Sequence, residues 1–328
     1  MSQQTTAGRQ WQSRKVVVVG AGAVGSTFAY ALMQAGIAEE IAILDLNREH
    51  AEGQVLDLAH GLPFTNPVSI RLGTPEDYAD AQVVVVTAGA KQKPGESRLD
   101  LLRRNAAIMR QIMAEIVERQ SQAIVLVVSN PVDILTQVAL DACDRSRLRV
   151  IGSGTVLDSI RFRYLLGLHC GVNSQNVHSY ILGEHGDSEL AAWSMTHIGG
   201  VRMDDYCRVC QKCAGDSEQQ RKRIAEEVKN SAYHIINYKG ATWFAVGLAL
   251  VRIVRAILRN ERSVLTVSTR LEGEYGISGV CLSVPCIVGS RGIEEIIVAN
   301  LADSEQEALE NSAAILRKSL DELREGER

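Results

Sequence analysis

The stretch from Lys15 to Asp45 constrains the fold of this chain more than any other part of its sequence. It begins with four consecutive valines at 16–19, turns through GAGAVG at 20–25, and continues through small residues to a second apolar run that ends in Asp45. An apolar run without alternation is typical of a strand buried on both faces, as in a parallel sheet. The order of strand, glycine turn, helix, strand and acid predicts a βαβ unit that binds a dinucleotide.

The three glycines of this turn are expected to have separate roles. Gly20 permits a tight turn, Gly22 lets the backbone approach a pyrophosphate, and Gly25 lets helix and strand pack closely. The phosphates would then lie on the free N–H groups at the helix N-terminus. Asp45 follows about 20 residues later, where its carboxylate can accept both ribose hydroxyls and would repel a 2′-phosphate. We therefore expect NAD rather than NADP; a glycine turn that only joins packed elements would not explain all five features.

Length and composition indicate a globular protein of two domains. The 328 residues exceed the usual size of a single core, and 46% of them are hydrophobic. A net charge of −4 gives no reason to expect binding to nucleic acid or to a membrane. Residues 1–14 are polar and lack the apolar segment of a signal peptide, so we expect a loose arm and a cytoplasmic location. The seven cysteines should then be reduced thiols.

Apolar strands alternate with helical patterns over residues 15–154. A helix is expected to begin at Thr74, because Pro75 follows it at the first helical position. Further strands are predicted at Val68–Leu72, Val83–Thr87, Ile124–Val128 and Arg149–Ile151. With the first two strands these make a doubly wound, six-stranded parallel Rossmann sheet, whose ligands bind beyond the carboxyl ends of the strands.

Residues 155–328 are expected to form a second, α+β domain packed on the first. A helical stripe of apolar residues covers 217–239, and the capping box Ser304–Glu307 predicts the start of a final helix. Antiparallel strands are predicted at Val177–Leu182, Val264–Arg270 and Val280–Val288.

Two segments that follow predicted strands carry polar groups toward the expected ligand site. The loop at 88–100 is polar, contains Gly and Pro, and is longer than a connection requires. We interpret it as a lid that carries Arg98, although an ordinary surface loop with a solvated arginine would look similar. Asn130 follows the next strand and its amide can donate to a substrate oxygen, but turn formation alone also favours Asn-Pro.

Two further positions offer acid–base chemistry. Asp158 and Arg161 are three residues apart in a predicted helix and share a face, whereas Arg163 lies roughly 200° around from Arg161. His185 lies between two glycines in GEHGD at 183–187, with room around its ring. A helix cap, a surface ion pair or a structural histidine would explain each residue alone. Beside a dinucleotide site, however, they together indicate an active site.

From about Lys15 to the final helix, the chain resembles the lactate/malate dehydrogenase family. Six motifs in the family order carry this resemblance. They are GAGAVGS (20–26), AGAKQKPGESRLDLLRRN (88–105), SNPVD (129–133), LDSIR (157–161), GEHGD (183–187) and KGATWFAVGLAL (239–250).

The resemblance implies a role for each candidate residue. His185 would be the acid/base, Asp158 its orienting partner and Arg161 the anchor of the substrate carboxylate. Arg98 would polarise the reacting carbonyl, and Asn130 would hydrogen-bond the reacting oxygen. The cofactor-binding residues would be Gly20, Gly22, Val24, Gly25, Asp45, Thr87, Gly89, Asn130 and Ser153.

These roles agree with the chemistry of hydride transfer to a 2-keto acid. A planar guanidinium pairs bidentately with a carboxylate, so Arg161 can orient the substrate under the nicotinamide. Arg98 would stabilise the charge that develops on the carbonyl oxygen while His185 donates the proton. Asp158 should raise the pKa of His185, because its negative charge favours the imidazolium.

Gln92 and Thr242 are expected to line the substrate pocket, and Gln92 to select the substrate. Malate dehydrogenases resemble this loop but have an arginine there, which pairs with a second carboxylate. A neutral amide would leave the extra charge of oxaloacetate unpaired, at a cost of several kcal/mol. We therefore expect pyruvate and lactate. The alternatives are malate or another 2-hydroxy acid, or an NAD-binding regulatory protein without turnover.

Arg163 and His178 resemble the residues with which bacterial members of the family bind fructose 1,6-bisphosphate between two subunits. A bisphosphate would neutralise cations that repel across a twofold axis, and the resemblance also implies a homotetramer. The alternative is a basic interface without a ligand. Cys207, Cys210 and Cys213 have the spacing of metal ligands but lack an obvious fourth ligand, so no metal is expected.

Overall fold

The valine run forms β1 (Lys15–Val19), whose five residues are all buried. The computed structural model describes residues 13–93, 95–210 and 217–325, so the predicted arm lies almost entirely outside the described residues. β1 pairs in parallel with β2 (Glu40–Leu44) on one side and β4 (Val83–Val86) on the other. Burying one valine side chain stabilises the fold by roughly 1.5 kcal/mol or more, so such runs favour the centre of a sheet.

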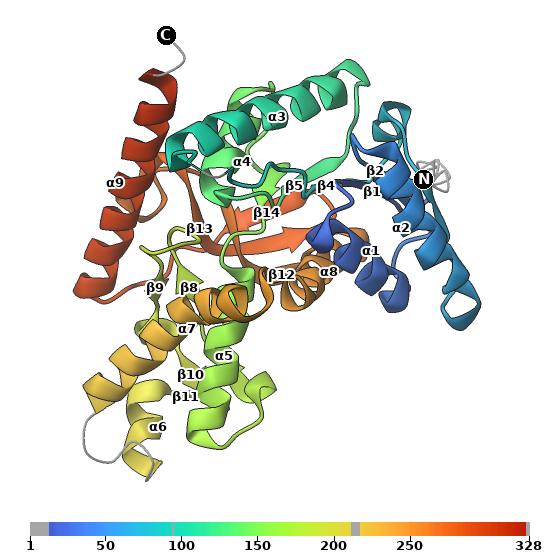
Figure 1. The fold of residues 1–328 in the computed structure, drawn as a ribbon. Coiled ribbons are helices and arrows are strands. Elements are labelled where there is room, and N and C mark those ends of the chain that lie inside the picture. The colour runs from blue at the N-terminus through green and yellow to red at the C-terminus, as the bar shows by residue number, and fades with distance from the viewer. Residues whose placement is uncertain (1–12, 94, 211–216, 326–328) are drawn as a thin grey trace, which may run out of the picture.

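Six parallel strands occur in the order β6-β5-β4-β1-β2-β3, which confirms the doubly wound fold. The strands not yet bounded are β3 (Ser69–Leu72), β5 (Ile124–Val127) and β6 (Val150–Gly152). Helices cover both faces of this sheet, with α3 and α4 on one side and α1 and α8 on the other (Figure 1). Their bounds are α1 (Ala23–Ala35), α2 (Arg48–His60), α3 (Arg98–Glu118), α4 (Val132–Asp141) and α8 (Phe244–Leu258).

The sheet continues past its parallel part into the second half of the chain. β12 (Ser263–Glu272), β13 (Ser278–Gly289) and β14 (Gly292–Ile296) add antiparallel strands beyond β6 and make nine strands in all. Ser268 of β12 pairs with Gly152 of β6, where a Cβ would lie only 2.9 Å from the Cβ of Ser268. A glycine therefore permits this junction, which the strand pattern did not reveal, and the domain boundary at 154 stays a prediction.

The elements from α5 to α7 form the lower lobe of Figure 1, below the sheet. α7 coincides with the predicted helix, whereas the predicted strand at 177–182 is wrong: it splits into β7 and β8 in separate sheets. The carbonyls of Ser179 and Tyr180, between the two, accept from Arg163 Nε and the Ala192 N–H. The bounds are α5 (Val156–Cys170), β7 (Val177–His178), β8 (Ile181–Leu182), β9 (Leu190–Ala191), β10 (His197–Ile198), β11 (Val201–Arg202), α6 (Met203–Val209) and α7 (Ser217–Lys239).

Two predicted helix starts also need correction. α9 begins at Asp303 rather than after Ser304, because Glu305 reaches back to accept the Ala302 N–H at 3.1 Å. Thr74 does cap a helix, but only the short 3₁₀ segment Pro75–Tyr78. The other bounds are α9 (Asp303–Glu325) and the 3₁₀ helices Leu62–Phe64, Ser174–Asn176, Trp193–Met195 and Glu274–Gly276.

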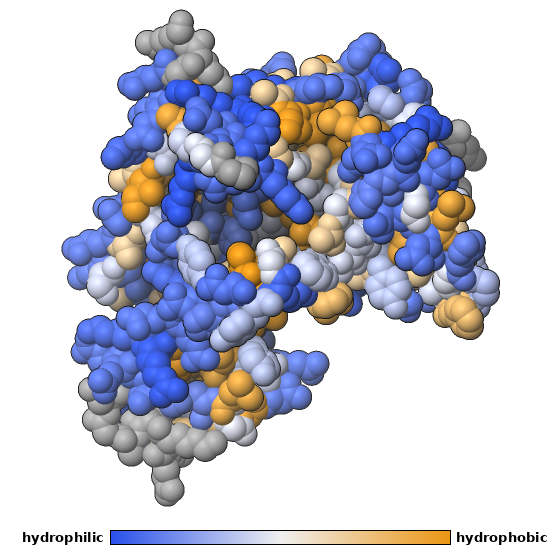
Figure 2. All heavy atoms as spheres, in the orientation of Figure 1, coloured by the Kyte–Doolittle hydropathy of each residue, from blue (hydrophilic) through white to orange (hydrophobic). Residues whose placement is uncertain are grey.

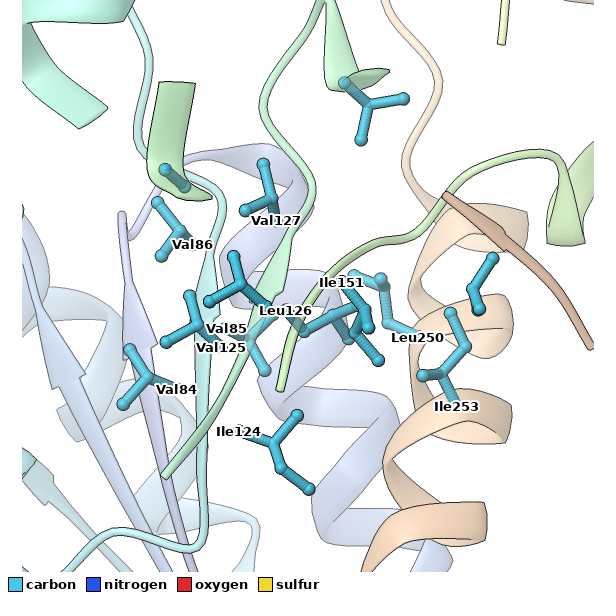
Figure 3. Packing of buried hydrophobic residues seen from close by; sticks show 14 of the residues in the cluster. Val84, Val85, Val86, Ile124, Val125, Leu126, Val127, Ile151, Leu250 and Ile253 are labelled. Atoms are coloured by element: carbon cyan, nitrogen blue, oxygen red, sulfur yellow. The ribbon is translucent and has the colours of Figure 1, made fainter. Parts of the chain in front are cut away.

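The main core lies between the sheet and its helices. Side chains from β4, β5 and β6 pack with Leu250 and Ile253 of α8 (Figure 3). Hydrophilic residues cover most of the face shown in Figure 2, and apolar residues form smaller patches on it. Among the described residues, no helix combines the length and hydrophobicity that crossing a membrane requires.

A buried ion-pair network surrounds Lys15, the first residue of β1. Lys15 Nζ lies 2.7 Å from a carboxylate oxygen of Asp77 and 2.7 Å from one of Asp80. Arg71 contacts Asp77 and Glu40. The Asp77 side chain is 7% exposed and that of Asp80 is 72% exposed. Hydrogen bonds from Arg71 and Lys15 overcome the effect of burial and hold the pKa of Asp77 well below its usual value.

Asp77→Asn should therefore destabilise the protein by about 3 kcal/mol, since it leaves buried Lys15 without its buried counter-charge. Asp80→Asn removes an exposed partner of the same lysine and should cost less than about 1 kcal/mol. Chemical denaturation at neutral pH measures both changes. Equal losses for the two variants would contradict this account of the network.

Candidate active site

The glycine turn has the geometry that a dinucleotide requires. Gly20 adopts a positive φ of 105°, and a Cβ on Gly25 would lie 1.9 Å from the Gly20 carbonyl oxygen, so both positions need glycine. A Cβ on Gly22 would meet nothing within 4 Å, which leaves that side of the turn open to a ligand. Asp45 accepts the N–H groups of Ala21 at 2.7 Å and Asn47 at 2.9 Å, which fixes its carboxylate beside the turn.

A cavity of about 450 Å³ lies where the strand ends meet α5, α7 and α8. Eight of the predicted site residues line it. They are Val24, Thr87, Gly89, Asn130, Ser153, Arg161, His185 and Thr242. Gly20, Gly22, Gly25 and Asp45 do not line it. Residues from both halves of the chain thus form one site, as expected for a cofactor and a substrate that react with each other.

A buried carboxylate joins the two most reactive side chains. His185 Nδ1–H donates to Asp158 Oδ2 at 2.6 Å, and Arg161 Nη1 donates to Asp158 Oδ1 at 2.6 Å. The Asp158 side chain is only 3% exposed, whereas His185 and Arg161 reach the cavity. Because Nδ1 is held by Asp158, Nε2 is the imidazole nitrogen available to a ligand.

The electrostatics of this group favour a charged imidazole. Burial lowers the pKa of His185, but the charge and hydrogen bond of Asp158 more than offset this effect and raise the pKa to about 9. Burial likewise disfavours ionised Asp158, but His185 and Arg161 hold its pKa below the usual value. The arrangement can therefore store a proton on His185 at neutral pH and deliver it from Nε2.

The backbone that carries His185 is held from three sides. Gly183 exchanges two hydrogen bonds with Ser283 of β13, and the Glu184 N–H donates to Ser312 Oγ of α9 at 2.8 Å. The His185 N–H donates to Asp133 Oδ2 at 2.8 Å. Sequence reasoning missed Asp133, Ser283 and Ser312; only the place of Asp133 in the SNPVD motif could have drawn attention to it.

Another missed residue is Glu189, a buried carboxyl group close to Asp158 and His185. Burial, and then the negative charge of Asp158, raise the pKa of Glu189 to about 8, so it is mostly neutral at pH 7. Within the described ranges, the ligand atoms of Asp158, His185 and Glu189 lie within 4.8 Å of one another and form a group that could hold a metal ion. The cysteines do not join it: Cys207 lies in α6, Cys210 follows that helix, and Cys213 lies outside the described residues.

Of the predicted lid, Gly89, Ala90 and Lys91 line the cavity, but the two residues expected to meet the substrate do not. Gln92 and Arg98 are exposed and do not line it. Gln92 Nε2 instead donates to the Glu96 carbonyl at 2.8 Å, and Arg104 Nη2 donates to the Lys91 carbonyl at 2.9 Å. Contacts within the loop and with α3 therefore set its position, and Arg98 lies in the first turn of α3.

Arg163 and His178 lie outside the cavity, and Arg163 contacts the segment that follows His178. Arg163 Nε donates to the carbonyl of Ser179, the residue after His178, at 3.2 Å. Its guanidinium also lies 5.3 Å from the centre of the Tyr180 ring. Burial lowers the pKa of Arg163, whereas His178 is exposed on β7. The cross-strand neighbour of His178 is His197.

Comparisons with known proteins identify the family of the chain. Residues 14–152 match the family model for the NAD binding domain of lactate/malate dehydrogenase, and residues 155–326 match that for its alpha/beta C-terminal domain. An L-lactate dehydrogenase of Treponema denticola is 59% identical over 95% of this chain and 99% of its own length. One from Acetivibrio thermocellus is 52% identical over 94% of this chain and 97% of its own length.

Solved structures give the same result. The crystal structure of a lactate dehydrogenase from a Medee basin deep-sea metagenome library has a TM-score of 0.93 and 41% identity, and the match covers 96% of this chain and 100% of that one. The ligand-bound minor L-lactate dehydrogenase of Enterococcus mundtii has a TM-score of 0.91 and 44% identity, and its match covers 94% of this chain and 98% of that one.

Proposed function

The chain belongs to the lactate/malate dehydrogenase family, and we propose that it is an NAD-dependent L-lactate dehydrogenase. The reaction would be reversible hydride transfer between NADH and pyruvate, which gives (S)-lactate and NAD. The observation that carries this proposal is the buried carboxylate of Asp158, which holds His185 and Arg161 together at the wall of the cavity. The relatives called L-lactate dehydrogenase, at 59% and 52% identity, support it.

His185 would be the proton donor in pyruvate reduction. Its pKa of about 9 keeps the ring charged at neutral pH, so Nε2 holds the proton that the developing alkoxide takes up. In lactate oxidation the neutral ring would accept the hydroxyl proton at the same nitrogen. Reduction should therefore weaken as the pH rises through this pKa, because the proton donor is lost.

The open side of the turn at Gly22 and the fixed carboxylate of Asp45 fit the pyrophosphate and ribose of NAD. Val24, Thr87 and Ser153 line the same cavity as His185 and can hold the nicotinamide end. When bound, NAD(H) supplies or accepts the hydride. The chain itself contributes orientation and the proton.

Arg161 would anchor the substrate carboxylate. One of its terminal nitrogens is engaged by Asp158, which fixes the guanidinium plane and leaves its other N–H groups for a ligand. Arg98 would complete the site when the loop closes, since it must approach the reacting carbonyl to stabilise the developing charge. Asn130 and Thr242 line the cavity and would contact the substrate directly.

The substrate should be pyruvate, because Gln92 gives the closing loop a neutral amide. NADH oxidation with pyruvate, oxaloacetate and 2-ketoisocaproate should show the highest kcat/KM for pyruvate. Gln92→Arg should shift the ratio of oxaloacetate to pyruvate kcat/KM by about 100-fold or more, since an unpaired buried charge costs roughly 3 kcal/mol. Gln92→Met, a neutral control of similar size, should not gain oxaloacetate activity. A wild-type preference for oxaloacetate would contradict the assignment.

We further propose a homotetramer that fructose 1,6-bisphosphate activates through Arg163 and His178. The contact of Arg163 with the residue after His178 supports this proposal, because it places the guanidinium beside the segment that carries the histidine. Two such pairs across a twofold axis would repel each other without the ligand. The bisphosphate would therefore favour the assembled, active arrangement.

Adding fructose 1,6-bisphosphate should lower the half-saturating pyruvate concentration about tenfold, which corresponds to a coupling of roughly 1.4 kcal/mol. Arg163→Gln should abolish this response because it removes the phosphate partner. Arg208→Gln, which changes an exposed arginine of α6, should retain it. Steady-state kinetics at low pyruvate, with sedimentation to follow assembly, makes the measurement. An unchanged half-saturation in the wild type would count against the effector site.

A further inference from the structure

We infer that Asp133 is a positioning residue for the proposed reaction: its carboxylate fixes the backbone of His185 and places a second negative charge behind the imidazole. The inference rests on the proposed function, because it concerns the proton that His185 donates. Asp133 lies in the first turn of α4, three residues after Asn130, and is 2% exposed. It is not among the residues that line the cavity.

Both oxygens of the Asp133 carboxylate have defined partners. Oδ2 accepts the His185 N–H at 2.8 Å, and Oδ1 accepts the hydroxyl of Ser268 at 2.6 Å. Ser268 lies on β12 at the point where this strand pairs with Gly152 of β6. Asp133 therefore ties the loop of His185 to the junction between the parallel and the antiparallel parts of the sheet.

The charge of Asp133 is more than these hydrogen bonds require. An asparagine of the same shape could accept the His185 N–H with its oxygen and donate to Ser268 Oγ with its nitrogen, since a serine hydroxyl can also accept. Burying a carboxylate is costly, and desolvation raises the pKa of Asp133 to about 6. Folding therefore does not require a charge at this position, yet the Asp133 carboxylate stays ionised at neutral pH. This combination indicates an electrostatic role for Asp133.

The neighbouring charges direct this effect to His185. The Asp158 carboxylate accepts hydrogen bonds from two cationic side chains, His185 and Arg161. The Asp133 carboxylate accepts hydrogen bonds from the His185 backbone and from Ser268. Asp133 is among the groups that raise the pKa of His185, after Asp158. The other titratable groups that act on these two residues are Glu184 and Glu189 from the His185 loop and Cys281 from β13.

Two fixed points on one residue also define the position of the ring. Asp158 holds Nδ1 of the imidazole, and Asp133 holds the backbone N–H of the same residue. Together they restrict both the rotation of the ring and the position of its Cα. Proton transfer depends on placing Nε2 within hydrogen-bond reach of the substrate oxygen, so small displacements cost rate.

The test is the pH profile of kcat/KM for pyruvate in Asp133→Asn. This variant keeps the shape and removes the charge, so the high-pH midpoint, where His185 loses its proton, should fall by about one unit. One unit above the variant's midpoint, activity should be several-fold lower than in the wild type. A purely structural role would lower the melting temperature or scale the whole profile without moving this midpoint.

Ser268→Ala is the matched second variant. It keeps the carboxylate and its bond to His185 but removes a hydrogen bond that favours the ionised form of Asp133. Protonation of Asp133 at low pH removes its charge and should lower activity, so the midpoint of this low-pH loss should rise while the high-pH midpoint stays in place. If Asp133→Asn does not fold, this shift alone tests whether activity requires the charge of Asp133. A folded Asp133→Asn with the wild-type high-pH midpoint, or Ser268→Ala with an unmoved low-pH midpoint, would overturn the inference.

Failure of the proposed function would look different, because the wild type itself would then fail to oxidise NADH with pyruvate. In that case the influence of Asp133 on His185 is measured by diethyl pyrocarbonate, which modifies the neutral imidazole and is followed at His185 by peptide mass spectrometry. The midpoint of modification should be about one pH unit lower in Asp133→Asn than in the wild type. Coincident curves would refute the inference independently of turnover.

Discussion

The hydrogen bond between His185 Nδ1 and the buried carboxylate of Asp158 is the interaction on which the rest of the site depends. A carboxylate that is 3% exposed is costly to ionise, and it stays ionised here because two cations share it. The hydrogen bonds of Asp158 also orient the Arg161 guanidinium and leave Nε2 as the free nitrogen of the His185 ring. One buried charge thus places the proposed proton donor and the proposed carboxylate anchor beside each other.

The fold makes this interaction possible by bringing distant segments to one edge of a sheet. Parallel strands deliver the glycine turn and Asn130, while the antiparallel extension beyond β6 carries Ser268 and Ser283. The loop of His185 is consequently fixed from α4, β13 and α9 before any ligand binds. In contrast, Arg98 is exposed in the first turn of α3, next to a loop that has its own internal contacts. The rigid part of the site holds His185, and the part that we propose to move carries Arg98.

Local patterns predicted most of the fold but not its long-range contacts. The valine runs and the turn at Gly20 act within a few residues, and the predicted parallel strands end within about a residue of the observed ones. The contact of Asp133 with Ser268 joins residues far apart in sequence, as does the contact of Glu184 with Ser312, so no periodicity reveals either. The sequence pattern did not reveal that β12 pairs with β6 at Gly152, because this contact depends on a glycine that leaves room for Ser268. The position of Arg98 over a substrate depends on loop closure, which local sequence does not determine.

The most direct measurement of the central claim is an NMR titration of the His185 ring nitrogens in the wild type and in Asp158→Asn, without substrate. If the buried carboxylate holds the proton on His185, the wild-type midpoint should lie near pH 9. It should fall below the ordinary histidine value of about 6.5 in the variant, because burial then acts without a full counter-charge. A wild-type midpoint near 6.5, or one that the substitution leaves unchanged, would contradict the account.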